Sequence, residues 1–443
     1  MTVTDNVPRR CPYAVKRLIF HVDVNSAFLS WQAKYELEQL HSDRDLRLIP
    51  SAVGGDPTTR HGIVLAKSTP AKKYGVTTGE PLSRALEKCP QLVLVQPHFE
   101  EYVRNSRAFI RILREVAPIV EQASIDEAYC DMSGTERLYG DPVAFAQQLK
   151  KRIHDELRFT VNIGISNCKL LAKMASDFEK PDRVHTLFPN EIEQKMWPLP
   201  AGELFLVGRS SAKKLRSLGI HTIRDIACMD PAVLQQHFGK QGLSMWEHAH
   251  GIDPSPVQAV SDAAKSYGNS VTLRVDVTDA ANAKIILLSL CETVGARLRA
   301  DHAYIRSVAV TIKDCDFRTT SHQVVLPEPT NVTEIIYQRA CLLFDQLWDQ
   351  TPIRLLGVST GKITDESYHQ MDLFSAATNG PAPEKLSRLN AAIDQIRGRY
   401  GEDAVKRARF LENGSHMTRG LNKAKRENVT DDITDTAFPE ENP

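Results

Sequence analysis

The sequence lacks several features that would place it in common classes of protein. No run of residues approaches the ~20 apolar residues of a membrane-spanning helix, and the first ten residues contain no signal-peptide core. The eight cysteines form no C-x-x-C pair, which favours reduced thiols and argues against a zinc site. These absences predict a cytoplasmic protein that does not act in a membrane.

An excess of positive charge is also missing, since 55 basic residues balance 55 acidic ones. Bulk charge therefore does not indicate a nucleic-acid partner, and only local clusters of cations can do so. The composition, with 42% hydrophobic and 25% charged residues, is that of a globular protein. A length of 443 residues allows several domains.

Two adjacent carboxylates stand inside an apolar stretch, Ser124-Ile125-Asp126-Glu127-Ala128-Tyr129. Two buried acids without partners would cost several kcal/mol, so they must meet cations, hydrogen-bond donors or a metal ion. The alternative is a turn whose acids face water, where most charged residues lie.

A second stretch ends in another acid. Residues 18–24 alternate between an apolar face and a face that holds His21 and Asp23, which predicts a strand. If this strand lies beside the first stretch, three carboxylates meet and need cations. Magnesium takes carboxylates together with substrate phosphates, and two ions about 3.5–4 Å apart are the common device for phosphoryl transfer. Because strand neighbours point to opposite faces, Asp126 and Glu127 converge only if the backbone turns.

Together, His21-Val22-Asp23-Val24-Asn25-Ser26 and the stretch 124–129 resemble the Y-family translesion DNA polymerases of the DinB/UmuC type. The resemblance runs from about Lys16 to Asp365. It implies an α+β right-hand polymerase with a ferredoxin-like palm, small fingers, a helical thumb with a helix-hairpin-helix, and a β-α-β-β-α-β little finger.

The resemblance also implies the chemistry. Asp23, Asp126 and Glu127 would be catalytic and, with the backbone carbonyl of Val24, would bind two Mg²⁺ ions, with Mn²⁺ as an alternative ion. The primer 3′-hydroxyl would attack the α-phosphorus of a dNTP opposite a template base. No exonuclease acids are apparent, so the expected activity is translesion synthesis of low fidelity.

The expected domains follow from the same resemblance and from breaks in the sequence pattern. They are a leader at 1–15, the palm at 16–26 and 98–187, the fingers at 27–97, the thumb at 188–255, a linker at 256–264, the little finger at 265–365, and a tail at 366–443 with a helix at 383–410.

The nucleotide-binding residues implied by the family are Ser26, Ala27, Phe28, Thr69, Lys72 and Lys180. Phe28 stands where the family places an aromatic residue under the incoming sugar, and the alternative is a core phenylalanine. Thr69 and Lys72 replace the family's usual tyrosine and arginine on the triphosphate, so the arginine fork is lost. Their alternative is a solvated helix start with Thr69 as N-cap. For Lys180 the alternative is a surface lysine at a helix end.

The stretch from Leu204 to Arg224 holds five basic residues and no acid. Its helix–glycine turn–helix pattern predicts a hairpin that binds a DNA phosphate through backbone N–H groups. The predicted DNA contacts are Gly208, Arg209, Ser210 (in place of the usual second glycine), Lys213, Lys214, and, in the little finger, Arg306 and Arg318. An ordinary amphipathic helix and solvated strand faces are the alternatives.

The stretch Gln370-Met371-Asp372-Leu373-Phe374 resembles the pentapeptide that binds the bacterial sliding clamp, with Gln370, Met371, Leu373 and Phe374 as the contacts. A chance match is the alternative, as for any short motif. The expected partners of this monomer are therefore primer-template DNA, dNTP and the clamp β subunit. A non-catalytic subunit that binds DNA and clamp is the alternative function; Thr69 supports it and the three acids argue against it.

Overall fold

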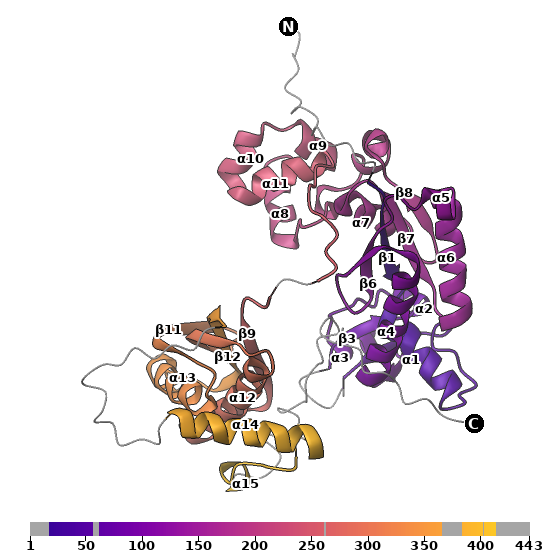
Figure 1. Ribbon diagram of the computed structural model, residues 1–443. Helices are drawn as coiled ribbons and strands as arrows, with labels where there is room; N and C mark the ends of the chain where they lie inside the picture. The colour runs from indigo at the N-terminus through magenta and orange to yellow at the C-terminus, as the bar shows by residue number, and fades with distance from the viewer. Residues whose placement is uncertain (1–16, 56–61, 261–262, 366–382, 402, 413–443) are drawn as a thin grey trace. The chain divides into compact units, whose positions relative to one another are not determined.

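A computed structural model describes residues 17–55, 62–260, 263–365, 383–401 and 403–412 (Figure 1). The chain forms two compact units, the first with residues 17–55 and 63–260 and the second with the described residues from 263 onward. The border between the units falls inside the predicted linker 256–264, and the finer domain borders remain predictions.

The first unit is built on a five-stranded sheet with the order β5-β6-β1-β7-β8. Its strands are β1 (Ile19–Val24), β5 (Ile119–Gln122), β6 (Glu127–Asp131), β7 (Val161–Ser166) and β8 (Val184–Thr186). In chain order β1, β5, β6 and β7 are the four strands of a ferredoxin-like sheet, and β8 extends its edge in parallel with β7. The palm prediction therefore matches the observed strand order.

The alternation of β1 decides what covers each face of this sheet. Phe20, Val22 and Val24 point into the main core with α4 (Phe99–Val116) and α6 (Pro142–Leu157). The opposite face holds Ile19, His21 and Asp23 and carries α7 (Lys169–Asp177). Short helix α5 (Glu136–Tyr139) precedes α6.

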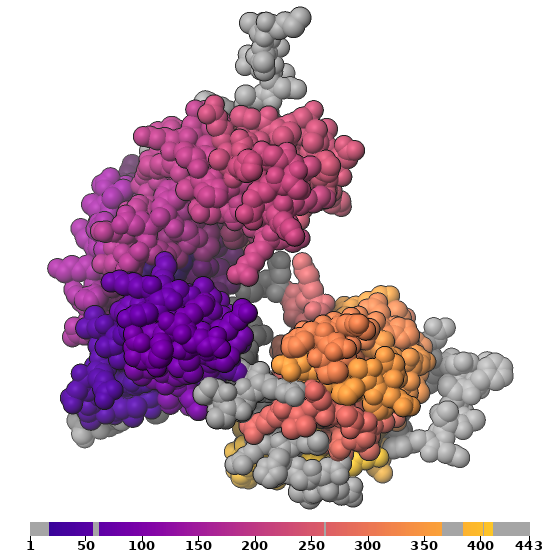
Figure 2. Space-filling model, turned by 180° about the vertical axis from the view of Figure 1, so that it is seen from behind, coloured from indigo at the N-terminus to yellow at the C-terminus, as the bar shows by residue number. Residues whose placement is uncertain are grey.

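Two smaller groups of elements complete the first unit. A three-stranded sheet, β3-β2-β4, is formed by β2 (Ser51–Gly54), β3 (Val64–Lys67) and β4 (Val93–Val95), with α1 (Ala27–Glu38), α2 (Thr69–Lys73) and α3 (Leu82–Lys88). The helical group contains short turns at Pro189–Glu191, Ile192–Met196 and Ala201–Glu203, and α8 (Arg209–Ser217), α9 (Ile223–Cys228), α10 (Pro231–Phe238) and α11 (Lys240–Ala249). These helices share a core with Leu170, Leu171 and Met174 of α7 and form the rose-coloured body in Figure 2.

The second unit has the predicted β-α-β-β-α-β order. Its elements are β9 (Tyr267–Val277), α12 (Ala280–Ala300), β10 (Tyr304–Asp314), β11 (Thr319–Thr330), α13 (Thr333–Leu347) and β12 (Ile353–Thr364). The sheet is antiparallel with the order β11-β10-β12-β9, and α12 and α13 supply helical residues to its core.

The last helices belong to the second unit. α14 (Pro383–Tyr400) lies along α12 and is followed by α15 (Arg409–Glu412) (Figure 1). The predicted helix 383–410 was therefore too long at its C-terminal end. Gly401, with a φ of +93°, ends α14, because a left-handed residue cannot continue a right-handed helix.

Two further expectations were wrong in detail. A strand was expected over residues 124–129, but β6 begins only at Glu127, because Ala123 and Ser124 donate backbone hydrogen bonds to the carbonyl of Glu127 and close a turn between β5 and β6. The chain before Gly208 forms only the single turn Ala201–Glu203 instead of a full first hairpin helix.

Candidate active site

The pairing of β1 with β6 brings the three predicted carboxylates to one end of the sheet. Asp23 is the direct antiparallel partner of Glu127, so both side chains project from the same face. The backbone N–H of Val24 donates to the carbonyl of Asp126 at 3.0 Å, which places Asp126 beside the end of β1. Asp126 therefore lies next to the two paired acids along the backbone, in the turn between β5 and β6.

Ser124 fixes the shape of that turn. Its hydroxyl donates to Oδ1 of Asp126 at 2.6 Å and accepts from the backbone N–H groups of Asp126 and Glu127 at 3.2 and 3.1 Å. One short side chain thus orients the first acid and holds the backbone of both acids.

Two lysines contact the carboxylates of Asp23 and Glu127. Lys173 belongs to α7, and Lys180 follows that helix. Nζ of Lys180 lies 2.5 Å from Oδ2 of Asp23, and Nζ of Lys173 lies 2.5 Å from Oε1 of Glu127. Both lysines also approach Asp177, at 2.8 Å for Lys180 and 3.7 Å for Lys173. The site is thus a compact network of alternating charges.

The pKa values of the two paired acids are shifted in opposite directions. Burial raises the pKa of Asp23 to about 6, although Lys180 opposes the shift. Burial alone would raise the pKa of Glu127 as well, but contacts with His21 and Lys173 outweigh it and bring that pKa to about 2. Burial would lower the pKa of Lys180, but Asp23 and Asp177 outweigh it and raise that pKa.

His21 lies beside Glu127 on the same face of the sheet. The ring is fully buried; its Nδ1 lies 2.8 Å from the hydroxyl of Ser176, and its Nε2 lies 3.7 Å from Oε2 of Glu127. Burial lowers the pKa of this imidazole, which favours the neutral ring.

Gly164 explains why α7 comes close enough to deliver these side chains. It is the register partner of His21 on β7, and a Cβ built on it would lie 2.0 Å from the carbonyl oxygen of Ala172 in α7. Any side chain there would push the helix off the sheet. Glycine therefore sets the distance between Lys173 and the acids.

The sequence reasoning missed Lys173, Asp177 and His21. Two signals were available: Lys173 and Asp177 are spaced i, i+4 on one helix, and His21 lies two residues before Asp23 on the same strand face.

Apart from Lys180, which lies at Asp23, the predicted nucleotide-binding residues fall into two groups. Ser26 adopts a left-handed conformation (φ 46°) that starts α1, so Ala27 and Phe28 lie in the first turn after β1. Thr69 and Lys72 are both exposed on α2. The N-cap of α2 is Ser68, which accepts from the N–H of Ala71, so the alternative in which Thr69 caps this helix was wrong.

The hairpin before α8 has a geometry that the sequence did not predict. Gly208 is the N-cap of α8 and has an extended backbone, whereas the left-handed residue is Leu206 (φ 70°), whose side chain is 63% exposed. Ser210 lies in the first turn of α8, and its assignment to the second hairpin glycine stays a prediction. Arg209 and Lys213 are exposed, while Lys214 donates to the carbonyl of His237.

The remaining predicted contacts are separate from this hairpin. Arg306 on β10 donates to the carbonyl of Pro327 at 3.3 Å, and Arg318 is exposed just before β11. The clamp-binding stretch 370–374 lies outside the described residues.

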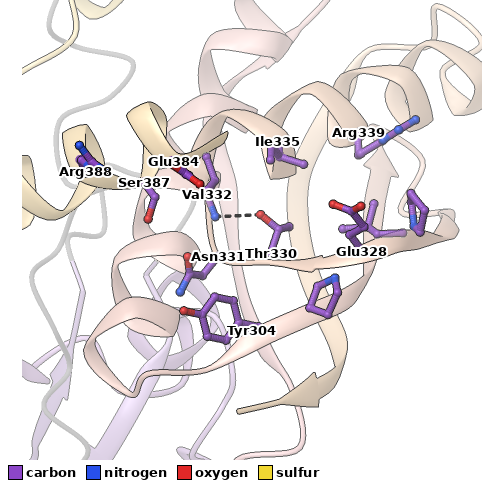
Figure 3. A pocket seen from close by; sticks show the side chains of 13 residues that line it. Tyr304, Glu328, Thr330, Asn331, Val332, Ile335, Arg339, Glu384, Ser387 and Arg388 are labelled. Atoms are coloured by element: carbon purple, nitrogen blue, oxygen red, sulfur yellow. Dashed lines mark hydrogen bonds between the residues drawn. The ribbon is translucent and has the colours of Figure 1, made fainter. Parts of the chain in front are cut away.

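A cavity of about 380 Å³ opens in the second unit where β11, α13 and α14 meet (Figure 3). Tyr304, Thr330, Arg339 and Ser387 are among its lining residues, and the predicted catalytic, nucleotide-binding and DNA-binding residues are not. Its walls carry charges of both signs, Glu328 and Glu384 besides the arginines, which gives no preference for one class of ligand.

Sequence comparisons agree with this arrangement. Residues 22–177 match the impB/mucB/samB family, residues 264–373 match the C-terminal domain of that family, and residues 203–253 match the thumb domain of DNA polymerase-iota. The chain is 44% identical over 399 residues to the DNA polymerase IV of Clostridium acetobutylicum, which covers 90% of this chain and 99% of that protein. It is 38% identical over 400 residues to the DNA polymerase IV of Alkaliphilus oremlandii, covering 89% and 99%.

A structural relative shows the same fold. The Y-family DNA polymerase chimera Dbh-Dpo4(243-245)-Dbh matches with a TM-score of 0.66 at 24% identity, covering 78% of this chain and 99% of that one. The fold and the sequence relatives define a DNA-directed DNA polymerase. The chain belongs to the impB/mucB/samB family, the Y-family DNA polymerases of the DinB type, and the predicted fold class is confirmed.

Membership of this family carries a general dependence on divalent metal ions. Among the described residues, no three His, Cys, Asp or Glu side chains already converge on one metal position. Within that same part of the chain, no helix combines the length and the apolar content of a membrane span.

Proposed function

We propose that this polymerase carries out translesion synthesis of low fidelity by two-metal nucleotidyl transfer. The observation that carries the proposal is that Asp23, Asp126 and Glu127 occupy neighbouring backbone positions at one end of the palm sheet. Family membership supports a polymerase of this type, and the carboxylates supply the hard oxygen ligands that Mg²⁺ prefers. Mn²⁺ is the alternative ion.

The residues present suit such ions. The ammonium groups of Lys173 and Lys180 lie on Glu127 and Asp23, so the site already attracts positive charge. The three carboxylates and the carbonyl of Val24 would hold the ions, which would polarise the phosphate and lower the pKa of the primer 3′-hydroxyl.

This chain's own residues would position the other reactants. Lys180 is 37% exposed and is therefore accessible to the triphosphate. Thr69 and Lys72, exposed on α2, offer a hydroxyl and a charge to the same group. Ser26, Ala27 and Phe28 follow β1 directly, so they would lie near the sugar of a nucleotide whose phosphates are held at Asp23.

DNA contacts would come from both units. Gly208, Arg209, Ser210, Lys213 and Lys214 would bind a backbone phosphate at the start of α8, and Arg306 and Arg318 would bind phosphates along the second unit's sheet. Residues 370–374 would bind the sliding clamp. The enzyme would act as a monomer in the cytoplasm.

Replacing Asp126 tests the proposal. Asp126→Asn keeps the shape of the side chain and should abolish primer extension with Mg²⁺ or Mn²⁺, while primer-template affinity stays near that of the wild type, because this acid would hold ions and not DNA. Asp131→Asn, at the far end of β6, is the matched control and should leave extension intact. Near-normal extension by Asp126→Asn would show that the metal site has been assigned to the wrong residues.

A non-catalytic subunit that binds DNA and clamp is the competing function. Thr69 in place of the family's tyrosine favours it, but the presence of the three acids at neighbouring positions of the palm sheet disfavours it. The same extension assay on the wild type separates the two functions.

A further inference from the structure

Lys173 lies between the two paired carboxylates. Its Nζ is 2.5 Å from Oε1 of Glu127 and 3.9 Å from Oδ2 of Asp23. Only 13% of the side chain is exposed, so bulk water does little to screen these contacts. Without a nearby cation, the two acids would repel each other across the strand pair.

Asp177 provides a third carboxylate close to the ammonium group of Lys173. Oδ2 of Asp177 is 3.7 Å from Nζ of Lys173 and lies one helical turn further along α7. The Asp177 side chain is 45% exposed and does not belong to the three predicted metal ligands. Lys173 can therefore exchange Glu127 for Asp177 by rotating its side chain, with no movement of the backbone.

Lys180 differs from Lys173 in how much of its side chain is exposed to solvent. Its Nζ contacts Asp23 and Asp177 at 2.5 and 2.8 Å, and its side chain is almost three times as exposed as that of Lys173. This lysine has a solvent-facing side on which a triphosphate could bind. Lys173 is enclosed by carboxylates, which suits an internal counter-ion better than a substrate ligand.

We infer that Lys173 is a resident counter-ion of Asp23 and Glu127 that competes with a divalent cation for these carboxylates, and that Asp177 receives its ammonium when the cation binds. The inference rests on the proposed function, in which the same acids hold the metal. Lys173 is thus a positioning residue: it keeps the acids paired before the cation arrives and weakens the binding of that cation.

Binding of Mn²⁺ to the full chain, without DNA or nucleotide, tests this role directly. Free Mn²⁺ can be counted by electron paramagnetic resonance during a titration. In Lys173→Gln the competing charge is gone, so the Mn²⁺ Kd should fall about threefold or more. In Asp177→Asn the receiving carboxylate is gone, so the Kd should rise by a similar factor; coupled neighbours commonly differ by such amounts.

The double variant and a matched control sharpen the test. If Asp177 acts through Lys173, Asp177→Asn should have a smaller effect in the Lys173→Gln background than alone. Lys169→Gln removes a lysine of α7 that is buried to a similar degree and whose Nζ lies 2.6 Å from Glu121, which is not one of the predicted metal ligands. Its Mn²⁺ affinity should equal that of the wild type.

The possible results separate this inference from the proposed function. If Asp126→Asn binds Mn²⁺ as well as the wild type does, the metal assignment itself fails. If Asp126→Asn loses binding but Lys173→Gln binds Mn²⁺ no more tightly than the wild type, only the role of Lys173 is overturned. Should Lys173→Gln not fold, Asp177→Asn decides alone, and an unchanged Kd there refutes the inference.

Discussion

Phe28 is the residue that we propose lies beside the sugar of the incoming nucleotide. Its ring stacks on Tyr102 with the centroids 5.0 Å apart and meets Phe99 edge to face at 6.1 Å. The side chain is only partly buried, so it packs against the core and still presents a surface. A ring held in this way is rigid enough to exclude a 2′-hydroxyl from a sugar placed beside it.

We expect Phe28→Ala to raise the use of ribonucleotides relative to deoxyribonucleotides. The measurement is the ratio of kcat/KM for the two substrates opposite the same template base, in wild type and variant. Loss of the ring's packing should also lower Tm, because a buried Phe→Ala change costs up to about 3–5 kcal/mol and this ring is only partly buried.

Phe99→Ala is the matched control, since it removes a ring of the same aromatic cluster from α4. This control should lower Tm without changing the substrate ratio. If Phe28→Ala also lowers Tm and leaves the ratio unchanged, Phe28 is a core residue and the choice of sugar is made elsewhere.

Among the elements, α14 is attached to the second unit by polar contacts instead of a broad apolar face. Arg299 of α12 binds Asp394 through two nitrogens, at 2.5 and 3.0 Å. Asn390 donates to Glu334 at 2.9 Å, and Arg407 donates to Glu334 at 2.6 Å. Glu334 thus binds α14 through Asn390 and the segment after α14 through Arg407, so part of this attachment depends on the charge of Glu334.

Acid should weaken this attachment. Burial alone would raise the pKa of Glu334, but hydrogen bonds from Arg407 and Asn390 outweigh it and hold that pKa below its ordinary value of 4.5. A carboxyl with a lowered pKa contributes stability that is present above its ordinary pKa and is lost as the pH falls through the folded value. We expect the Tm of Glu334→Gln to depend less on pH than that of the wild type between about pH 6 and pH 3.

Thermal unfolding followed by circular dichroism measures this difference. Asp345→Asn, which breaks an exposed ion pair between α13 and Lys284, is the control and should keep the pH dependence of the wild type. Equal pH dependence in Glu334→Gln and the wild type would mean that Glu334 does not hold α14 in place.

At the scale of the whole molecule, the balanced charge limits how strongly the enzyme is attracted to DNA. The chain carries no net charge, so general attraction to DNA is weak and a partner that retains the enzyme on DNA would be useful. The stretch 370–374 connects β12 with α14, two elements of the second unit.

Replacing both Leu373 and Phe374 with Ala should remove binding to the sliding clamp, because two apolar anchors would leave their pocket. Synthesis without clamp should stay unchanged. A direct binding titration with the purified clamp, together with extension assays with and without it, measures both effects. Asp372→Ala in the same stretch is the control; unchanged clamp affinity in the double variant would refute the assignment.

Local patterns in the sequence determined much of this protein. The alternation in residues 18–24 predicted β1 and the face that carries Asp23, because a period of two is a property of the strand itself. The order of strands and helices in the second unit was also predicted, since each is bounded by local turn signals. The two acid-bearing stretches were sufficient to place the chain in its family.

The tertiary structure decided what surrounds the acids. Lys173 meets Glu127 across 46 positions of chain and Lys180 meets Asp23 across 157, and neither distance follows from a local period. Both contacts depend on the register of β1 with β6 and on the close approach of α7 at Gly164. In the same way, the sequence of α14 has the pattern of an amphipathic helix, but the ion pair between its Asp394 and Arg299 forms only when the second unit has folded. Contacts between distant segments are set by packing, which a sequence pattern does not encode locally.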